Sequence, residues 1–307
     1  MGFFAVLAAS LFAVFIFTVF GGYSLLLWCQ QSLWMVVPPA LVLAVLVWTF
    51  LKMDDKITAL QKRVDELEAA FRQHPKALIL CNPSNPCGKV FTRAELELIA
   101  DMAEKYDTYV ITDEVYEHIV YAPYQHTYFA TLPGMWERTI SCSSLSKTYS
   151  ITGWRLGYLI GPAEVIEHAK KVHDFLTVGA PAPLQEAACV GVRFPQSYYK
   201  ELTALYTRKR DVFLAGLDRL GLKHNVPQGT YFVLLDISDF LALDRFRGWS
   251  DLEFCEWMIR EIGVAAVPGS SFFREPVNHL IRLHFARSEE TLEHALDRLA
   301  KLAALLH

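Results

Sequence analysis

The chain has 307 residues and a formal charge of −4, and it shows no basic excess or Lys/Arg stripe, which argues against nucleic acid as a partner. Its six cysteines form no CxxC pair, and no His/Cys group has zinc spacing, so no metal site is expected. The charges are unevenly placed, because residues 1–51 contain no Asp, Glu, Lys or Arg. The remainder has the composition of an ordinary soluble domain.

The uncharged segment contains two apolar runs, residues 3–28 and 33–51, on either side of a polar patch at 29–32. Each run could supply the roughly 20 helical residues that cross about 30 Å of hydrocarbon. We therefore expect a transmembrane hairpin at 1–51 that contacts the membrane through residues 3–51, with Pro38-Pro39 kinking or breaking the second span. A cleaved signal is less favoured, because no basic residue precedes the first run. Positive residues follow from Lys52, so we expect an inner-membrane protein whose globular part is cytoplasmic.

Residues 52–75 predict a short amphipathic stalk. Apolar residues recur here at spacings of four and three, which is typical of a coiled-coil seam between charged faces: Met53, Ile57, Leu60, Val64, Leu67 and Phe71. The seam lasts under three heptads, so a single helix packed on its own domain is an equal alternative. His74-Pro75 should end the helix, since the residue before proline avoids the helical region.

The rest of the chain predicts part of a large α/β domain at 76–162, followed at 163–307 by bridging helices and a small C-terminal domain. Short apolar runs at 77–81, 109–112, 139–142 and 157–160 predict strands of a mixed, mostly parallel sheet, with a helix at 93–106 after a capping box of Thr92 and Glu95. Beyond Pro162 we expect helices near 163–176, 182–193, 197–220 and 251–262, strands at 230–237 and 280–286, and a last helix from 289. That order predicts a smaller α+β domain.

Three loops that follow the predicted strands carry polar side chains. They hold Asn85, then Asp113 with Tyr116, then Ser144 with Lys147. Loops after neighbouring parallel strands collect at one edge of a sheet, so these groups should share one crevice. Singly, each has an ordinary alternative as a turn residue, a helix cap or a surface aromatic, but the set of them at successive strand ends favours a site.

Four motifs together resemble one family. They are Asn-Pro-Ser-Asn-Pro-Cys-Gly at 82–88, Thr-Asp-Glu-Val-Tyr at 112–116, Ser-Leu-Ser-Lys-Thr-Tyr-Ser-Ile-Thr-Gly-Trp-Arg-Leu-Gly-Tyr at 144–158, and Ile-Arg-Leu-His-Phe-Ala at 281–286. In this order they resemble the class I/II aminotransferases, which are pyridoxal-phosphate enzymes of fold type I. Residues 91–96 and 133–139 are similar to the kynurenine and glutamine transaminase K branch. The resemblance begins near Lys76 and runs to the C-terminus.

The resemblance implies a role for each candidate around pyridoxal phosphate. Lys147 would carry the cofactor as a Schiff base and later move the Cα proton of the substrate. Asp113 would pair with the pyridine nitrogen, while Tyr116 and Asn85 would hydrogen-bond the phenolic oxygen of the ring.

The phosphate and the substrate would be held by further residues. Ser144 and Arg155 would bind the phosphate, and Arg282 would clamp the α-carboxylate of the substrate, with Asn85 beside it. An arginine on a strand is otherwise usually a solvated edge charge. The resemblance thus implies catalytic Lys147, Asp113 and Tyr116.

The implied activity is transfer of an amino group between an amino acid and a 2-oxo acid, in amino acid metabolism or biosynthesis. The enzyme would be tethered to the membrane and could form a homodimer. Two alternatives stay open: a related pyridoxal-phosphate lyase, and a truncated or fused chain with impaired catalysis that acts as a membrane-anchored interaction module. The family usually has a long stretch before the Asn-Pro motif, where residues 1–75 stand here. Four retained strands would leave exposed sheet flanks.

Overall fold

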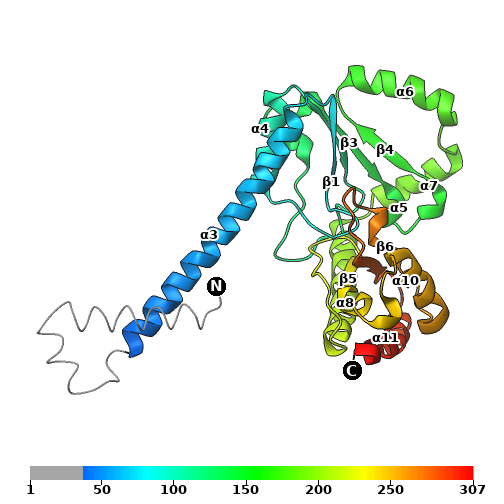
Figure 1. The fold of residues 1–307 in the computed structure, drawn as a ribbon. Helices are drawn as coiled ribbons and strands as arrows, with labels where there is room; N and C mark the ends of the chain where they lie inside the picture. The colour runs from blue at the N-terminus through cyan, green and yellow to red at the C-terminus, as the bar shows by residue number, and fades with distance from the viewer. Residues whose placement is uncertain (1–36, 307) are drawn as a thin grey trace, which may run out of the picture. The chain divides into compact units, whose positions relative to one another are not determined.

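The computed structural model describes residues 37–306, drawn in colour in Figure 1. The chain forms two compact units, Met1–Gln73 and His74–His307. In the first unit the described element is α3, one continuous helix from Val37 to Phe71. The expected kink at Pro38-Pro39 is absent from α3, because both prolines stand in its first turn, where a missing N–H is tolerated. The seam predicted at 52–75 therefore lies on a helix that begins earlier.

The structure does not support the predicted membrane hairpin. Among residues 37–306, no helix is both long and apolar enough to cross a membrane. Of the second predicted span, residues 37–51 form the apolar start of α3, which continues through the charged residues from Lys52, and residues 33–36 lie outside the described residues. The first predicted span lies outside the described residues. The cytoplasmic placement of the globular part stays a prediction.

The second unit contains a four-stranded sheet in the order β1-β2-β3-β4. β1 (Ala77–Cys81), β2 (Tyr109–Asp113) and β3 (Thr139–Ser144) run parallel, and β4 (Gly157–Ile160) pairs antiparallel with β3. The mixed, mostly parallel sheet is therefore as predicted. α4 (Arg93–Lys105) begins at the predicted capping box, with both of its reciprocal hydrogen bonds formed, and it buries Leu96, Ile99 and Ala103.

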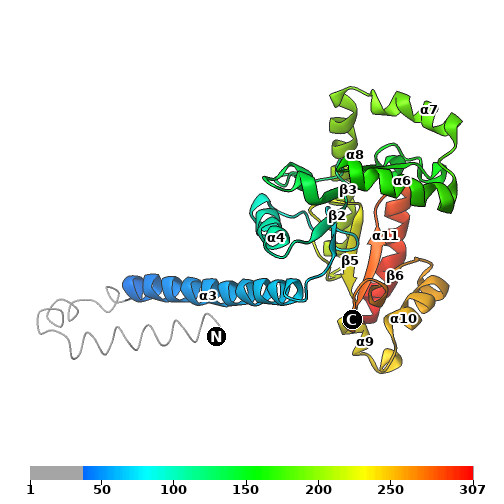
Figure 2. The same ribbon diagram turned by 90° about the horizontal axis from the view of Figure 1, so that it is seen from above.

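A second, antiparallel sheet has the order β5-β7-β6 and lies apart from the first (Figure 1). Its strands are β5 (Phe232–Asp236), β6 (Val267–Pro268) and β7 (Leu280–His284). The remaining helices of the second unit are α5 (Leu145–Thr148), α6 (Ala163–Thr177), α7 (Ala182–Val192), α8 (Gln196–Arg219), α9 (Ser238–Leu241), α10 (Asp251–Trp257) and α11 (Glu289–Ala303). Figure 2 shows α6 to α11 from above. α10 continues as a π-helical turn at Met258–Ile262, where the sequence predicted a single helix.

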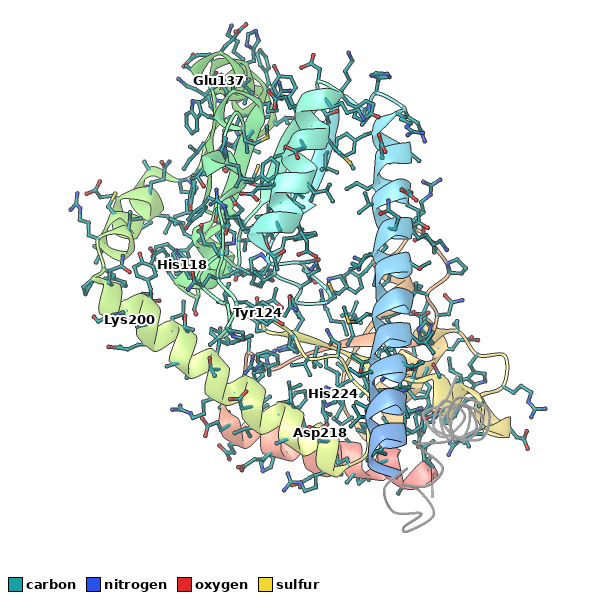
Figure 3. The ribbon with its side chains drawn as sticks, turned by 90° about the vertical axis from the view of Figure 1, so that its left-hand side faces the viewer. His118, Tyr124, Glu137, Lys200, Asp218 and His224 are labelled. Atoms are coloured by element: carbon teal, nitrogen blue, oxygen red, sulfur yellow. The ribbon has the colours of Figure 1, made fainter. Side chains whose placement is uncertain are left out.

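The main apolar core lies between the second sheet and the helices α8 and α11. Phe213 and Leu217 of α8, Leu235 of β5, Ile281 of β7 and Leu299 of α11 belong to it, and each is at most 2% exposed. Full burial of such side chains stabilises a fold by about 1.5–3 kcal/mol each. In Figure 3, α8 runs from Lys200 near one end to Asp218 near the other. This core fixes the sheet that carries Arg282.

The four-stranded sheet is covered on one face only. Leu80 and Val110 are at most 6% exposed, whereas their strand neighbours Ile79 and Tyr109 are 74% and 46% exposed. Leu159 and Ile160 of the edge strand β4 are also about half exposed. Exposed flanks were expected from the sequence, and the structure shows an open face as well.

The segment 228–230 joins the loop of the first sheet to the start of the second. The carbonyl oxygen of Gly88 accepts hydrogen bonds from the N–H groups of Gln228 at 2.8 Å and Gly229 at 2.9 Å. The hydroxyl of Tyr121, which is fully buried, donates to the carbonyl of Thr230 at 2.5 Å. These contacts bring the loops after β1 and β2 to the sheet of Arg282.

Candidate functional site

Asn85 and Arg282 are 197 residues apart in the chain, and their side chains are in direct contact. A guanidinium nitrogen of Arg282 donates to Oδ1 of Asn85 at 2.7 Å. The guanidinium also lies 4.1 Å from the ring centroid of Phe232 and 4.6 Å from that of Phe272. Burial lowers the pKa of Arg282 from its usual value. The guanidinium is thus oriented by an amide and two rings, with further donors left over for a ligand.

Arg282 does not lie on a sheet edge. It stands on β7, the central strand of its sheet, paired with Leu234 on one side and Val267 on the other. The backbone around it is therefore fully hydrogen-bonded, and its side chain is half-buried. The alternative of a solvated edge charge does not describe this arginine.

Tyr116 lies between Lys147 and the aromatic residues next to Arg282. It is 4% exposed, and its ring packs edge-on against Tyr231 at 5.3 Å and Phe232 at 5.8 Å between centroids. Burial raises the pKa of Tyr116 above its usual range, and Tyr231 adds to this, whereas the charge of Arg282 opposes it. The hydroxyl therefore stays protonated at neutral pH and can donate a hydrogen bond.

Lys147 lies in the short helix α5, directly after the third parallel strand. Its Nζ is 6.0 Å from the centroid of the Tyr116 ring and forms no hydrogen bond or ion pair with any residue from 37 to 306. The side chain is half-buried. An amine in this position is available to a carbonyl ligand that enters beside Tyr116.

Asp113 ends β2 between two cysteine neighbours, Cys81 of β1 and Cys142 of β3. One carboxylate oxygen accepts from the backbone N–H of Val115 at 3.3 Å, and the other lies 3.9 Å from the sulfur of Cys81. Burial, with a smaller effect of Asp113, raises the pKa of Cys81 to about 11, so the thiol is protonated. Asp113 itself is exposed, so its carboxylate can also accept a hydrogen bond from a ligand.

The two predicted phosphate residues face their own loop. Ser144 caps α5, and its Oγ accepts from the N–H of Ser146 at 3.1 Å and lies 3.0 Å from the carbonyl of Leu156. Arg155 has a left-handed backbone, with φ at 56°, and donates to the carbonyl of Thr152 at 3.0 Å. Among the described residues, the structure does not join Ser144 and Arg155 by a hydrogen bond. The two side chains would have to turn to hold one anion.

A cavity of about 500 Å³ has Ser144 as the one candidate residue in its lining. Ser144, Thr148, Tyr158 and Tyr199 are among its lining residues, whereas Lys147, Asp113 and Arg282 are not. We place the candidate site on the converging side chains, because they carry the chemistry. The assigned roles of Asn85, Asp113, Tyr116, Ser144, Lys147, Arg155 and Arg282 stay predictions.

Sequence reasoning missed the aromatic residues that surround Tyr116 and Arg282. Tyr231 and Phe232 stand at the start of β5, and Phe272 comes from the loop before β7. The pair Tyr231-Phe232 after Gly229 was a visible signal of a strand start, since aromatic residues are enriched in strands, but it did not indicate a site. Phe272 had no local signal.

The donor set agrees with what pyridoxal phosphate requires. The cofactor carries an aldehyde, a pyridine nitrogen and a phosphate, and the chain presents a free amine at Lys147, an accessible carboxylate at Asp113 and a guanidinium at Arg155. The unpaired Nζ of Lys147 is the observation that speaks most directly for this fit. The phosphate side is the less complete part.

A family model described as "Aminotransferase class I and II" matches residues 42–299. The match covers most of the chain and both sheets. It begins within α3, earlier than the start near Lys76 that the motifs indicated. The mixed sheet and the antiparallel second sheet are those of the fold type I α/β architecture.

Individual proteins show the same likeness. The kynurenine–oxoglutarate transaminase of Dictyostelium discoideum is 40% identical over 256 residues, which is 78% of this chain and 59% of that protein. Kynurenine–oxoglutarate transaminase 1 of Homo sapiens is 39% identical over 255 residues, covering 77% of this chain and 60% of that protein. The chain spans about 60% of the length of these relatives.

Two solved structures have the same arrangement of elements. Bna3p, a putative kynurenine aminotransferase of Saccharomyces cerevisiae, has a TM-score of 0.73 at 32% identity, over 78% of this chain and 60% of that one. YbdL of Escherichia coli, with a methionine aminotransferase function, has a TM-score of 0.71 at 36% identity, over 78% and 61%. With the family match, the fold and the converging side chains in agreement, the chain belongs to the class I and II aminotransferases.

Proposed function

We propose that this chain takes part in pyridoxal-phosphate-dependent transfer of an amino group from an amino acid of the kynurenine type to a 2-oxo acid. The observation that carries the proposal is the row of neighbouring side chains from Lys147 through Tyr116 and Phe232 to Arg282 and Asn85. The row combines an amine, a phenol and a guanidinium, which amino-group transfer requires. The relatives' printed names support the choice of substrate class.

Each side chain has a task that follows from its position. Pyridoxal phosphate, when bound, supplies an electron-withdrawing ring that stabilises negative charge at the Cα of the substrate. Lys147 would hold the cofactor through Nζ and, once released, take the proton from Cα. Asp113 would accept a hydrogen bond from the pyridinium N–H, and Tyr116, protonated because it is buried, would donate its hydroxyl proton to an oxygen acceptor.

Arg282 would bind the α-carboxylate of the substrate. Asn85 occupies one N–H of its guanidinium, and contact with the rings of Phe232 and Phe272 holds the plane, which leaves the remaining fork for two carboxylate oxygens. The rings also offer an apolar wall to an aromatic side chain. The choice of a kynurenine-type amino acid rests on the names of the relatives.

The proposal is tested by adding pyridoxal phosphate to the purified full chain and recording the visible absorbance of the lysine-bound cofactor. We expect a band in the wild-type chain, its loss in Lys147→Ala, and its retention in the control Lys170→Ala, whose amine is exposed on α6. Kynurenine or methionine with 2-oxoglutarate then tests turnover. Sedimentation velocity tests the homodimer.

The result that would refute the proposal is a correctly folded chain without the band. A band without turnover would support cofactor binding alone, and the reading of a chain with impaired catalysis would then be preferred. A band with elimination products in place of a new amino acid would favour the lyase.

A further inference from the structure

Two buried carboxylates follow the candidate residues Asp113 and Tyr116 in the chain but take no part in the contacts described for the candidate site. Glu114 is 2% exposed, and the side chain of Glu117 is 7% exposed. Both follow β2, on the segment that leads away from Asp113. Removing a carboxylate from water is costly unless a cation or several hydrogen bonds compensate for it. The surroundings of the two acids therefore need an explanation.

Neighbouring groups compensate for these charges only in part. Glu117 accepts from the hydroxyls of Ser143 at 3.0 Å and Tyr158 at 3.1 Å. Oε1 of Glu114 makes no hydrogen bond with any described residue, although Nε2 of His126 lies 3.3 Å away. Within residues 37–306, neither carboxylate forms an ion pair with a Lys or Arg side chain.

Two histidines lie beside the acids without forming a hydrogen bond to either carboxylate. The ring of His126 is nearly buried, and neither of its nitrogens has a hydrogen-bond partner among the described residues. The other, His118, lies 3.9 Å from Glu117, and burial lowers its pKa although Glu117 opposes this. The His118 imidazole is therefore neutral at pH 7 and gives Glu117 no counter-charge.

A cavity of about 290 Å³ opens between these groups. Glu114, Glu117, Tyr128, Tyr158 and Trp136 are among its lining residues. The hydroxyls of both tyrosines stay protonated. Burial and then Glu117 raise the pKa of Tyr128. Burial raises the pKa of Tyr158 to about 12, although a hydrogen bond with Ser143 opposes this, and Glu117 adds to the rise. Aromatic faces next to carboxylates are a favourable environment for an organic cation. Among the described residues no group of His, Cys, Asp and Glu could hold a metal ion.

We propose that this cavity binds a small organic cation, an alkylammonium or guanidinium head group, between Glu114 and Glu117. The head group would donate to the free Oε1 of Glu114 and to Glu117, and its carbon chain would lie against the rings of Tyr158 and Trp136. Trp136 is 47% exposed and marks the open side of the cavity. The same head group can come from a free amine or from a Lys or Arg side chain of a peptide.

The test is calorimetric titration of the full chain with n-butylammonium chloride, with n-butanol as the uncharged control. We expect saturable binding of the cation and none of the alcohol. An acetylated Ala-Lys-Ala peptide in a parallel titration distinguishes the two sources. If the ligand is a side chain of a peptide, the peptide should bind more tightly than butylammonium. If the ligand is a free amine, the peptide should bind more weakly than butylammonium. Absence of saturable heat for both cations with folded protein would overturn the proposal.

Matched variants locate the site. Glu114→Gln and Glu117→Gln each remove one charge at nearly constant shape and should weaken binding about tenfold or more, the value of a charge-assisted hydrogen bond. The control is Glu137→Gln, an exposed residue that Figure 3 shows apart from His118, and it should leave binding unchanged. Equal weakening of cation binding in all three variants would contradict the location of the site between Glu114 and Glu117.

One further variant keeps the test decisive where a glutamine variant fails to fold. Ala130→Leu adds bulk to the cavity wall and leaves both carboxylates in place. Binding should be lost although circular dichroism shows a native fold. Unchanged binding in the folded Ala130→Leu chain would exclude this cavity as the site.

Discussion

Replacing Gly88 with alanine tests the contact that brings Asn85 to Arg282. Gly88 has φ at +68°, where an L side chain costs about 1–2 kcal/mol. Its new Cβ would meet Cβ of Pro227 at 2.5 Å and the carbonyl oxygen of Gly229 at 2.7 Å, and overpacking of this kind costs about 1–3 kcal/mol more. We expect Gly88→Ala to lower the free energy of unfolding by about 2–5 kcal/mol, the sum of these two costs.

The chain offers a control that separates backbone strain from the clash. Gly221 has the same φ of +68°, but an added Cβ there meets nothing within 4 Å. Urea unfolding, followed by circular dichroism, should show a loss of about 1–2 kcal/mol for Gly221→Ala and a larger loss for Gly88→Ala. Only Gly88→Ala should also weaken substrate binding, because Asn85 is three residues away. Equal losses would refute the reasoning from the clash.

Three further changes follow from single contacts. Tyr121→Phe should cost about 1–3 kcal/mol in urea unfolding, because it leaves the buried carbonyl of Thr230 without its donor. Glu95→Gln should cost about 1 kcal/mol at pH 7. Burial raises the pKa of Glu95, but hydrogen bonds from Lys89 and Thr92 outweigh this and lower the pKa below 4.5. The stabilisation by the carboxylate is therefore present above pH 4.5 and is lost as the pH falls through the folded pKa. The unfolding curves of the variant and the wild type should accordingly converge in acid. Arg282→Lys should raise KM about tenfold or more in the transamination assay, since an ammonium cannot form the planar fork, and an unchanged KM would argue against the clamp.

Local signals explain what could be predicted from the sequence. The run Ala77–Cys81 is short, apolar and followed by a turn, and it forms β1. The pair of Thr92 and Glu95 marks a helix start through hydrogen bonds that span three residues, and α4 begins there. Such features depend on neighbours in the chain, so the order of strands and helices was accessible without coordinates.

Contacts between distant segments were not accessible in this way. Phe272 reaches Arg282 from an irregular loop, and no periodicity marks it. Glu114 lies within the motif that supplied Asp113, yet its burial depends on the loop with His126 folding back over the sheet. Residues 37–51 of the second apolar run belong to α3, which continues to Phe71, and apolarity alone does not say how far a helix extends.

The open face of the four-stranded sheet gives a last prediction, which uses two adjacent residues of β1. A continuous apolar run is typical of a parallel strand that is buried on both faces, yet Ile79 is 74% exposed and Leu80 is 6% exposed. If this face is open in solution, Ile79→Ala should cost under about 1 kcal/mol, the range of strand propensity, whereas Leu80→Ala should cost about 2–5 kcal/mol through the cavity it leaves. Both losses are measured by urea unfolding of the full chain. A loss of several kcal/mol for Ile79→Ala would contradict the open face, because only a side chain that is covered in solution can lose that much.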